Sequence, residues 1–195
     1  IYMNGSQLTA GLLALKGDTA LTAEQQKNFR PLVTQMMVAI DKSNTQVVEV
    51  LSYLSDEQRQ ALMSPNLHPV MMPPTEDLKD PLVAAAIDAI KGTAGSKAAA
   101  PLVTDPSILR STQIDRSLLL NGLIGLEKAN APLSPEQAKS VLTVLESMQE
   151  QTVKIREAQK KIADSLTPAQ LQIVRQTSPP SLETLSVMLL DKSLK

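Results

Sequence analysis

Residues 21–58, LTAEQQKNFRPLVTQMMVAIDKSNTQVVEVLSYLSDEQ, decide the fold because they contain a complete long helix together with both of its boundary signals. Mostly apolar residues recur along this stretch at spacings that alternate between four and three, which is typical of a helix that packs along one stripe. We therefore predict a helix of about 30 residues, near 45 Å long at about 1.5 Å per residue. In order, the stripe is Phe29, Val33, Met36, Ile40, Ser43, Val47, Val50 and Leu54.

Capping signals mark the start of this helix and of the next one. Thr22-x-x-Gln25 and Ser55-x-x-Gln58 each place a hydroxyl three residues before a glutamine. In such a capping box the hydroxyl accepts a free N–H of the first turn, and the amide reaches back to the cap residue. The first half of the chain is predicted to form helices over 6–16, 23–53, 56–63 and 80–91, with a proline-rich loop over 64–79.

The same pattern returns 112 residues later, where Leu133-Ser134-Pro135-Glu136-Gln137 and Leu166-Thr167-Pro168-Ala169-Gln170 match the two boxes. The segment before the long helix is also repeated, at an offset of 111, because the second loop is one residue longer. There Leu8, Gly11, Leu12 and Leu15 match Leu119, Gly122, Leu123 and Leu126. The second stripe is Val141, Leu145, Met148, Thr152, Ile155, Gln159, Ile162 and Leu166, and the second set of helices is predicted over 106–128, 135–165, 168–176 and 181–192.

Self-similarity of this kind predicts an all-α protein of two tandem copies of a helical-hairpin unit. Each copy has one long helix of about 30 residues and shorter helices, and the copies pack as a helical bundle with pseudo-two-fold symmetry. Residues 1–92 are the predicted first copy and 106–195 the second. Residues 93–105 are the linker, in which the alanines at 98–100 would allow some helix.

Composition excludes several functions. Nineteen Lys and Arg against twenty Asp and Glu give a net charge of −1, whereas a nucleic-acid-binding protein needs a surplus of cations. Stacking aromatic residues are also scarce, with one Phe, two Tyr and no Trp. No apolar run reaches the length of about 18 residues that a membrane span needs. We therefore expect no nucleic-acid partner and no membrane span.

Catalytic chemistry has few residues to work with. The chain has no Cys and one His, and it contains no phosphate-binding loop, no Gly-x-Ser-x-Gly and no His-Glu-x-x-His. We therefore predict that it is not an enzyme and that it uses no cofactor. An enzyme that works through carboxylates is a more distant alternative, because it requires Asp and Glu side chains that converge in the fold.

A Met and His cluster gives one candidate metal site. Met63, His68, Met71 and Met72 fall within ten residues, and soft thioether and imidazole ligands suit Cu(I). The plainer interpretation is that these Met side chains fill gaps in the core beneath a proline-rich loop. The second copy has no such cluster.

Other polar and small residues inside the helices have structural explanations beside functional ones. Ser43, Thr152 and Gln159 on the stripes would either line a small cavity or fix the register of the bundle. Gly11, Gly122 and Gly125 lie within predicted helices, where close approach of two backbones explains a glycine better than a ligand does.

The four Leu-(Ser/Thr)-x-x-Gln motifs resemble those of the LTxxQ proteins, helical envelope proteins that include the Spy- and CpxP-type periplasmic chaperones and stress sensors. Gly11-Leu12-Leu13-Ala14-Leu15 followed by Thr22–Gln25 also looks like a group of secreted bacterial proteins. The resemblance implies an extracytoplasmic place: periplasmic, secreted or at the cell surface. Since the chain starts at Ile1 rather than Met, we expect that upstream residues such as a signal peptide have been removed.

These observations favour a non-enzymatic, extracytoplasmic binding, scaffold or assembly protein that acts through its helical surfaces, in one version as a chaperone. Its expected partners are other proteins or further copies of itself. The alternative is an envelope copper sensor or chaperone that uses the Met and His cluster.

Overall fold

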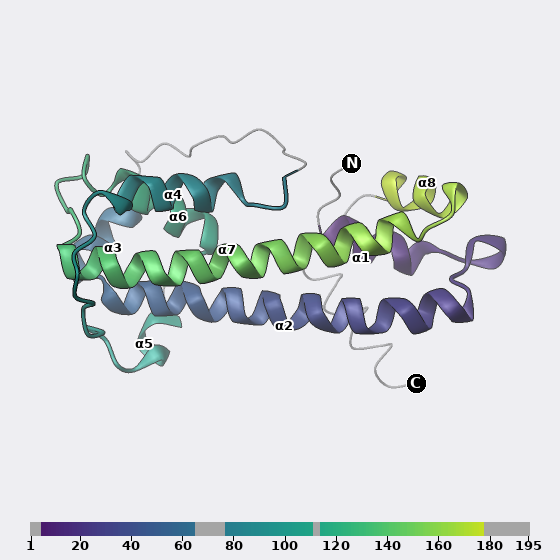
Figure 1. The fold of residues 1–195 in the computed structure, drawn as a ribbon, viewed down its shortest axis with the longest axis horizontal. Coiled ribbons are helices and arrows are strands. Elements are labelled where there is room, and N and C mark those ends of the chain that lie inside the picture. Colours follow the sequence, from purple (N-terminus) through teal and green to yellow (C-terminus); the bar gives the residue numbers. More distant parts are fainter. Residues whose placement is uncertain (1–4, 65–76, 111–113, 178–195) are drawn as a thin grey trace. The chain divides into compact units, whose positions relative to one another are not determined.

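The computed structural model describes residues 5–64, 77–110 and 114–177, and all the regular secondary structure within these residues is helical (Figure 1). The helices form a bundle, as predicted. None of the described helices is both long and apolar enough to cross a membrane. They are α1 (Gly5–Ala14), α2 (Ala23–Tyr53), α3 (Asp56–Leu62), α4 (Pro81–Lys91), α5 (Pro106–Arg110), α6 (Arg116–Gly125), α7 (Pro135–Asp164) and α8 (Pro168–Gln176), with a 3₁₀ turn η1 (Gly17–Thr19).

The capping boxes place the helix boundaries close to where the sequence predicts them. Both long helices, α2 and α7, begin at the predicted residue and end within one residue of the predicted end. All four boxes form: the hydroxyls of Thr22, Ser55, Ser134 and Thr167 each accept the N–H of the glutamine three residues on. The predicted helix over 181–192 lies outside the described residues, as does most of the predicted loop over 64–79.

The single helix predicted over 106–128 is wrong. The chain instead forms α5 and then α6, which starts afresh at Arg116. Asp115 caps this new start, because its Oδ1 accepts the N–H of Leu118 at 2.7 Å. A carboxylate that accepts a free N–H stabilises the start of a helix. The apolar periodicity of 106–128 predicted one continuous helix because it does not indicate such side-chain caps.

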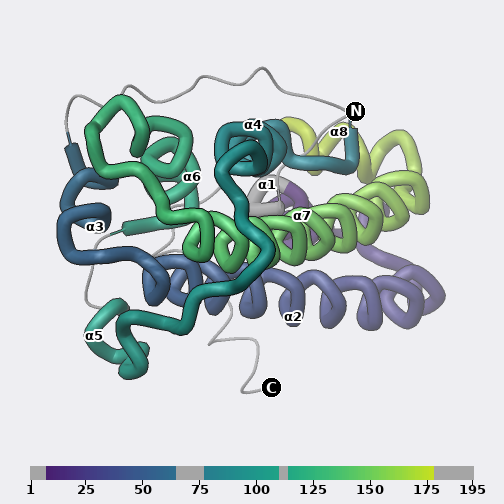
Figure 2. The backbone as a smooth tube through the Cα atoms, turned by 60° about the vertical axis from the view of Figure 1, so that its left-hand side comes forward, coloured from purple at the N-terminus to yellow at the C-terminus, as the bar shows by residue number. Residues whose placement is uncertain are grey.

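Residues 92–105 form no helix, despite the three alanines at 98–100. They run as an extended segment across the start of α7 and the end of α2 in unit 2, defined below (Figure 2). Three main-chain N–H groups anchor the segment: Gly95 donates to Pro135 O (2.8 Å), Ala99 to Ser140 Oγ (2.9 Å) and Leu102 to Ser52 O (2.7 Å). These tertiary hydrogen bonds outweigh the modest helix propensity of alanine.

The described helices belong to two compact units. Unit 1 contains residues 1–36 and 156–195, and unit 2 contains residues 37–155. The two long helices each contribute to both units, so each unit combines residues from both predicted copies. The predicted copy boundaries, 1–92, 93–105 and 106–195, concern duplication of the sequence and stay a prediction.

Unit 2 has a large aliphatic core. The first part of α7 runs beside the last part of α2 in the opposite direction (Figures 1 and 2), and α6 packs against both α3 and α4. Each buried Leu, Val or Met side chain contributes roughly 1.5–3 kcal/mol relative to an exposed one. Those with no exposed surface include Val50, Leu54, Leu62, Val83, Leu119, Leu145 and Met148.

In unit 1, α1 packs against α8 at a glycine. A Cβ on Gly11 would lie 2.5 Å from the Cα of Val174, so only glycine permits this contact. The predicted close approach of two backbones is thereby confirmed at Gly11. Phe29 and Ile162 from the two long helices are buried in the same unit.

Most residues of the two predicted stripes are buried, with two clear exceptions on α2. Val33 is 38% exposed and Ile40 is 45% exposed. Ile155 on α7 is half-buried. The repeated spacing therefore predicted which face of each helix is apolar, but not which parts of that face are covered.

Candidate functional site

Two glutamines from different helices pair with each other in unit 2. Gln58 Nε2 donates to Gln137 Oε1 (3.2 Å), and Gln137 Nε2 donates back to Gln58 Oε1 (3.0 Å). Each amide also donates to a main-chain carbonyl, Gln58 to Pro132 O (2.8 Å) and Gln137 to Tyr53 O (2.7 Å). Each Oε1 accepts the N–H of its own cap residue at 2.9 Å. Both amides thus use both donor hydrogens and both acceptor positions.

Unit 1 contains a second pair of this kind, formed by Gln25 and Gln170. Gln25 Nε2 donates to Gln170 Oε1 (2.9 Å), and Gln170 Nε2 donates to Gln25 Oε1 (3.1 Å). Gln25 also donates to Ser165 O (2.9 Å), and Gln170 to Ala20 O (3.2 Å). We call these two arrangements the amide pairs.

The amide pairs explain why all four motifs end in glutamine. A capping box alone accepts Glu as readily as Gln at this position, because only an acceptor is needed. The pairs also need N–H donors, which an ionised carboxylate lacks. The sequence predicted the boxes and missed the pairing, although the presence of Gln rather than Glu at all four positions was the available signal.

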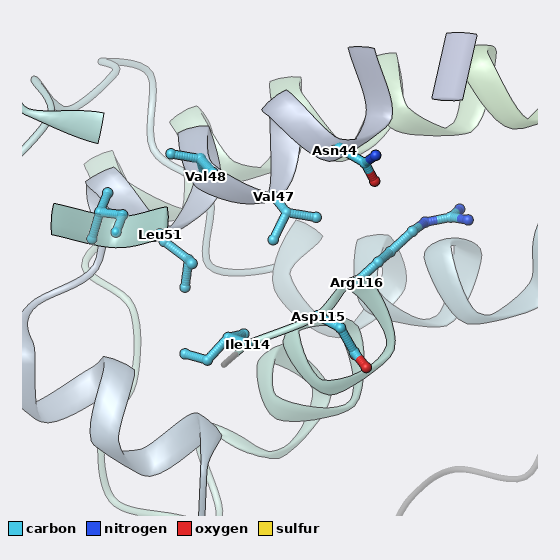
Figure 3. A pocket seen from close by; sticks show the side chains of 8 residues that line it. Asn44, Val47, Val48, Leu51, Ile114, Asp115 and Arg116 are labelled. Atoms are coloured by element: carbon cyan, nitrogen blue, oxygen red, sulfur yellow. The ribbon is translucent and has the colours of Figure 1, made fainter. Parts of the chain in front are cut away.

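A pocket of about 250 Å³ opens in unit 2 beside α2 (Figure 3). One end is apolar, with Val47, Leu51 and Ile114 side chains directed into it, and the rim is polar. Small-molecule sites usually have volumes of about 300–1,000 Å³, so this pocket suits a small group such as one apolar side chain. The lining residues are Asn44, Val47, Val48 and Leu51 of α2, Leu109 of α5, and Ile114, Asp115 and Arg116 at the start of α6.

The charge of Arg116 is held at one side of the pocket. Its Nη2 donates to Asp80 Oδ2 (2.8 Å) and to Thr152 Oγ1 (2.9 Å). In Figure 3 the guanidinium extends away from Leu51 and Ile114, so the charge of Arg116 lies apart from the apolar end. The exposed side chains of Asn44 and Asp115 complete the polar rim.

An exposed apolar face of α2 leads along the helix to this pocket. Met37 is 61% exposed and Ile40 is 45% exposed, while Val47 and Leu51 further along are buried at the pocket. Their spacing places them on one side of the helix together with Val48. We call Met37, Ile40, Val47, Val48 and Leu51 the apolar track of unit 2.

The polar residues of the predicted stripes do not line the pocket. Ser43, Thr152 and Gln159 are all buried, with exposures of 6–9%. Thr152 accepts from Arg116 and donates to Met148 O (3.2 Å), so its hydroxyl is satisfied inside the protein. At Thr152 the structural explanation therefore applies, because the hydroxyl positions Arg116.

The candidate metal ligands are only partly within the described residues. Met63 follows α3 as its C-cap and is 48% exposed. His68, Met71 and Met72 lie outside the described residues, so the copper hypothesis stays a prediction. In the part of the chain that the structure describes, no group of three or more His, Cys, Asp or Glu could hold a metal ion.

Among the described residues of unit 2, Tyr53 and Asp105 have shifted pKa values, and neither lines the pocket. Burial raises the pKa of Tyr53, and the nearby carboxylate of Glu49 raises it further. The pKa of Asp105 is lowered because the hydroxyl and the N–H of Ser107 both donate to its Oδ1 (2.7 and 2.9 Å). What the pocket itself offers is apolar contact bordered by hydrogen-bonding groups.

Comparison of the chain with protein-family models, with curated proteins and with solved structures finds no match.

Proposed function

We propose that this protein is a non-enzymatic binding protein that holds apolar segments of another polypeptide chain on the apolar track of unit 2. The observation that carries the proposal is the track itself, an exposed apolar face of α2 that continues into a pocket. An exposed apolar helix face with residues at spacings of three and four is a common means of holding an apolar segment of another chain. The residue of the bound polypeptide that reaches the pocket would insert one apolar side chain into it.

The polar rim supports a polypeptide partner rather than a lipid or another wholly apolar ligand. Asn44 offers a donor and an acceptor, and Asp115 offers a carboxylate oxygen beside the apolar end. A bound peptide has main-chain N–H and C=O groups that need partners at the edge of an apolar contact. One side chain in the pocket and main-chain groups at the rim satisfy both requirements.

We also propose that the chain is two copies of one helical unit related by a pseudo-two-fold axis. The supporting observations are contacts inside each unit that correspond at the offset of the sequence repeat. The bond from Gln25 to Ser165 O in unit 1 corresponds to the bond from Gln137 to Tyr53 O in unit 2, with the roles of the two copies exchanged.

Two further contacts follow the same rule. The bond from Gln170 to Ala20 O corresponds to that from Gln58 to Pro132 O. Where a Cβ on Gly11 would meet Val174, a Cβ on Gly122 would meet Leu62. Exchange of roles is what a two-fold relation between the copies requires. An extracytoplasmic place and kinship with the LTxxQ proteins stay proposals that rest on the motifs.

A binding titration tests the proposed function. The probe is a fluorescently labelled globular protein that has been reduced and alkylated so that it stays unfolded, and binding is measured by fluorescence anisotropy. Ile40→Glu should weaken binding by roughly tenfold or more, because burial of an Ile side chain contributes about 1.5–3 kcal/mol. The matched control is Val38→Glu, since Val38 is exposed on the same helix but lies off the track.

The outcomes separate the proposal from its alternatives. Equal binding by Ile40→Glu and the unsubstituted protein, or no binding by the latter, contradicts a polypeptide client on the track. Light scattering on the same samples measures self-association. If oligomers form and Ile40→Glu disperses them, the occupant of the track is a second copy of the chain.

A further inference from the structure

Two of the eight residues that line the pocket of unit 2 are charged, Asp115 and Arg116. The charge of Arg116 is compensated by a residue outside the lining, because its Nη2 lies 2.8 Å from Asp80 Oδ2. The Arg116 side chain is 32% exposed and that of Asp80 is 17% exposed, so water screens this ion pair only in part. Arg116 therefore offers little attraction to an anionic group of a bound chain.

The carboxylate of Asp115 is placed to meet a partner at the rim of the pocket. Its Oδ1 accepts the N–H of Leu118 at 2.7 Å, and this cap does not use the second carboxyl oxygen. Asp115 is exposed, and in Figure 3 its carboxylate and the guanidinium of Arg116 point in different directions. The N-terminus of α6 offsets part of the charge of Asp115, so we expect its effect on binding to be severalfold rather than larger.

A second carboxylate, that of Asp41, borders the apolar track. Asp41 is exposed on α2, four residues after Met37 and seven residues before Val48. Residues at these spacings lie on one side of a helix, whereas the next residue, Lys42, is turned by about 100° from Asp41. Since the net charge of the chain is only −1, a preference for charge at the track has to come from such local groups.

We propose that the partner of the apolar track is a cationic apolar segment, in which Lys or Arg side chains flank the apolar residue that enters the pocket. The apolar track remains the site, and Asp115 and Asp41 determine which segments it accepts. The inference rests on the proposed function and names the chemistry of its partner. An ammonium or guanidinium group beside the pocket would donate to a carboxylate oxygen, whereas an acidic segment would bring like charges together.

Three synthetic peptides of equal length test this selectivity by fluorescence anisotropy. Each has leucines at alternating spacings of three and four, and four of the positions between them carry Lys in the first peptide, Gln in the second and Glu in the third. One exposed ion pair changes affinity by up to about fivefold, and two carboxylates here attract one peptide and repel another. At low ionic strength we therefore expect the Lys peptide to bind about tenfold more tightly than the Glu peptide, with the Gln peptide between them. The difference should shrink at about 0.5 M salt, because exposed charges are screened.

Substitutions identify the carboxylates responsible. Asp115→Asn removes the charge but keeps the cap of α6, and it should reduce the ratio of the Lys and Glu affinities about threefold. Adding Asp41→Asn should bring the ratio close to one. The matched control is Glu49→Gln, which removes a carboxylate from an exposed position of α2 off the track and should leave the ratio unchanged. Affinity for the Gln peptide should stay the same in all these variants, which shows that the track is intact.

The outcomes separate the selectivity from the proposed function. Equal affinities for the Lys and Glu peptides would overturn the selectivity, while binding of the Gln peptide would still support an apolar client on the track. An unchanged ratio in Asp115→Asn, or an equal fall in Glu49→Gln, would overturn the role of Asp115. Binding of none of the three peptides would contradict the proposed function itself, and the selectivity with it.

Discussion

The amide pairs make a sharp prediction about the glutamine of the capping box. Gln58→Glu is nearly isosteric and keeps a side-chain oxygen at the position that accepts the N–H of Ser55. It removes both Nε2 donors, which serve Pro132 O and Gln137 Oε1. If the glutamine were only a cap, the substitution would be nearly neutral.

The expected cost follows from the two lost hydrogen bonds. Gln58 is only 6% exposed, so water cannot readily replace the missing donors. Each net hydrogen bond contributes about 1 kcal/mol, and oxygens left without a donor in a buried site raise this cost, so we expect a loss of about 3 kcal/mol. In a chain of this length that corresponds to a fall in Tm of roughly 6–12 °C.

The carboxyl introduced by Gln58→Glu also predicts a dependence on pH. Two oxygen acceptors and burial favour the neutral acid, so the pKa of the new carboxyl in the folded variant should lie above that of a glutamate in an unfolded chain, about 4.3. A raised folded pKa in an acid lowers stability as pH rises through the unfolded value and beyond. The difference between variant and unsubstituted protein should therefore shrink from pH 7 towards pH 4.

Urea unfolding followed by far-UV circular dichroism measures these differences. The matched control is Gln60→Glu, which makes the same change of charge on the same helix at an exposed position and should stay within about 0.5 kcal/mol. Equal stabilities of Gln58→Glu and Gln60→Glu would refute the argument that amide donors hold the two helices together.

Three further predictions address packing, capping and titration. Gly122→Ala should lower the free energy of unfolding in urea by about 2 kcal/mol, because its Cβ would lie 2.4 Å from Leu62 Cδ2 of α3. The control, Gly92→Ala, has nothing within 4 Å of the new Cβ and should be neutral or stabilising by up to about 1 kcal/mol. Asp80→Ala should lose about 1 kcal/mol more than Asp80→Asn in the same assay, because Asn can still cap α4; equal losses would exclude a capping role. In a Tyr2→Phe background, which leaves Tyr53 as the one tyrosine, absorbance titration should place the pKa of Tyr53 above its usual value of 10.0. The stability that the neutral phenol contributes should be fully present below pH 10.0 and should be lost as the pH rises through the raised pKa of the folded protein.

Local signals predicted the helices of this protein well. A hydroxyl and a glutamine three residues apart act within one turn of helix, so the starts of α2, α3, α7 and α8 could be located from a few residues each. The departures have two causes: Asp115 caps a new helix start that the apolar periodicity did not indicate, and contacts distant in sequence compete with local preference in the linker. Ala99 binds Ser140 instead of entering a helix.

The candidate site was less predictable than the fold. Its pocket requires α2, α5 and the start of α6 to meet, and no single stretch of sequence contains that information. The stripe predicted that Val47 lies on a buried side of α2, but the same pattern included Val33 and Ile40, which are 38% and 45% exposed. Periodicity predicts which side of a helix is apolar, whereas the exposure of each residue on that side depends on which other elements pack against it.

By itself, the sequence determined that the chain is helical, where its two long helices begin and which side of each is apolar. These properties depend on spacing and capping over a few turns. Only the tertiary structure decided that the four motif glutamines join in two reciprocal pairs, that residues 92–105 bind across α2 and α7 in unit 2, and that a pocket opens beside α2. The physical reason is that an amide hydrogen or a buried methyl group is satisfied by whichever partner the folded chain brings to it, at any distance along the sequence.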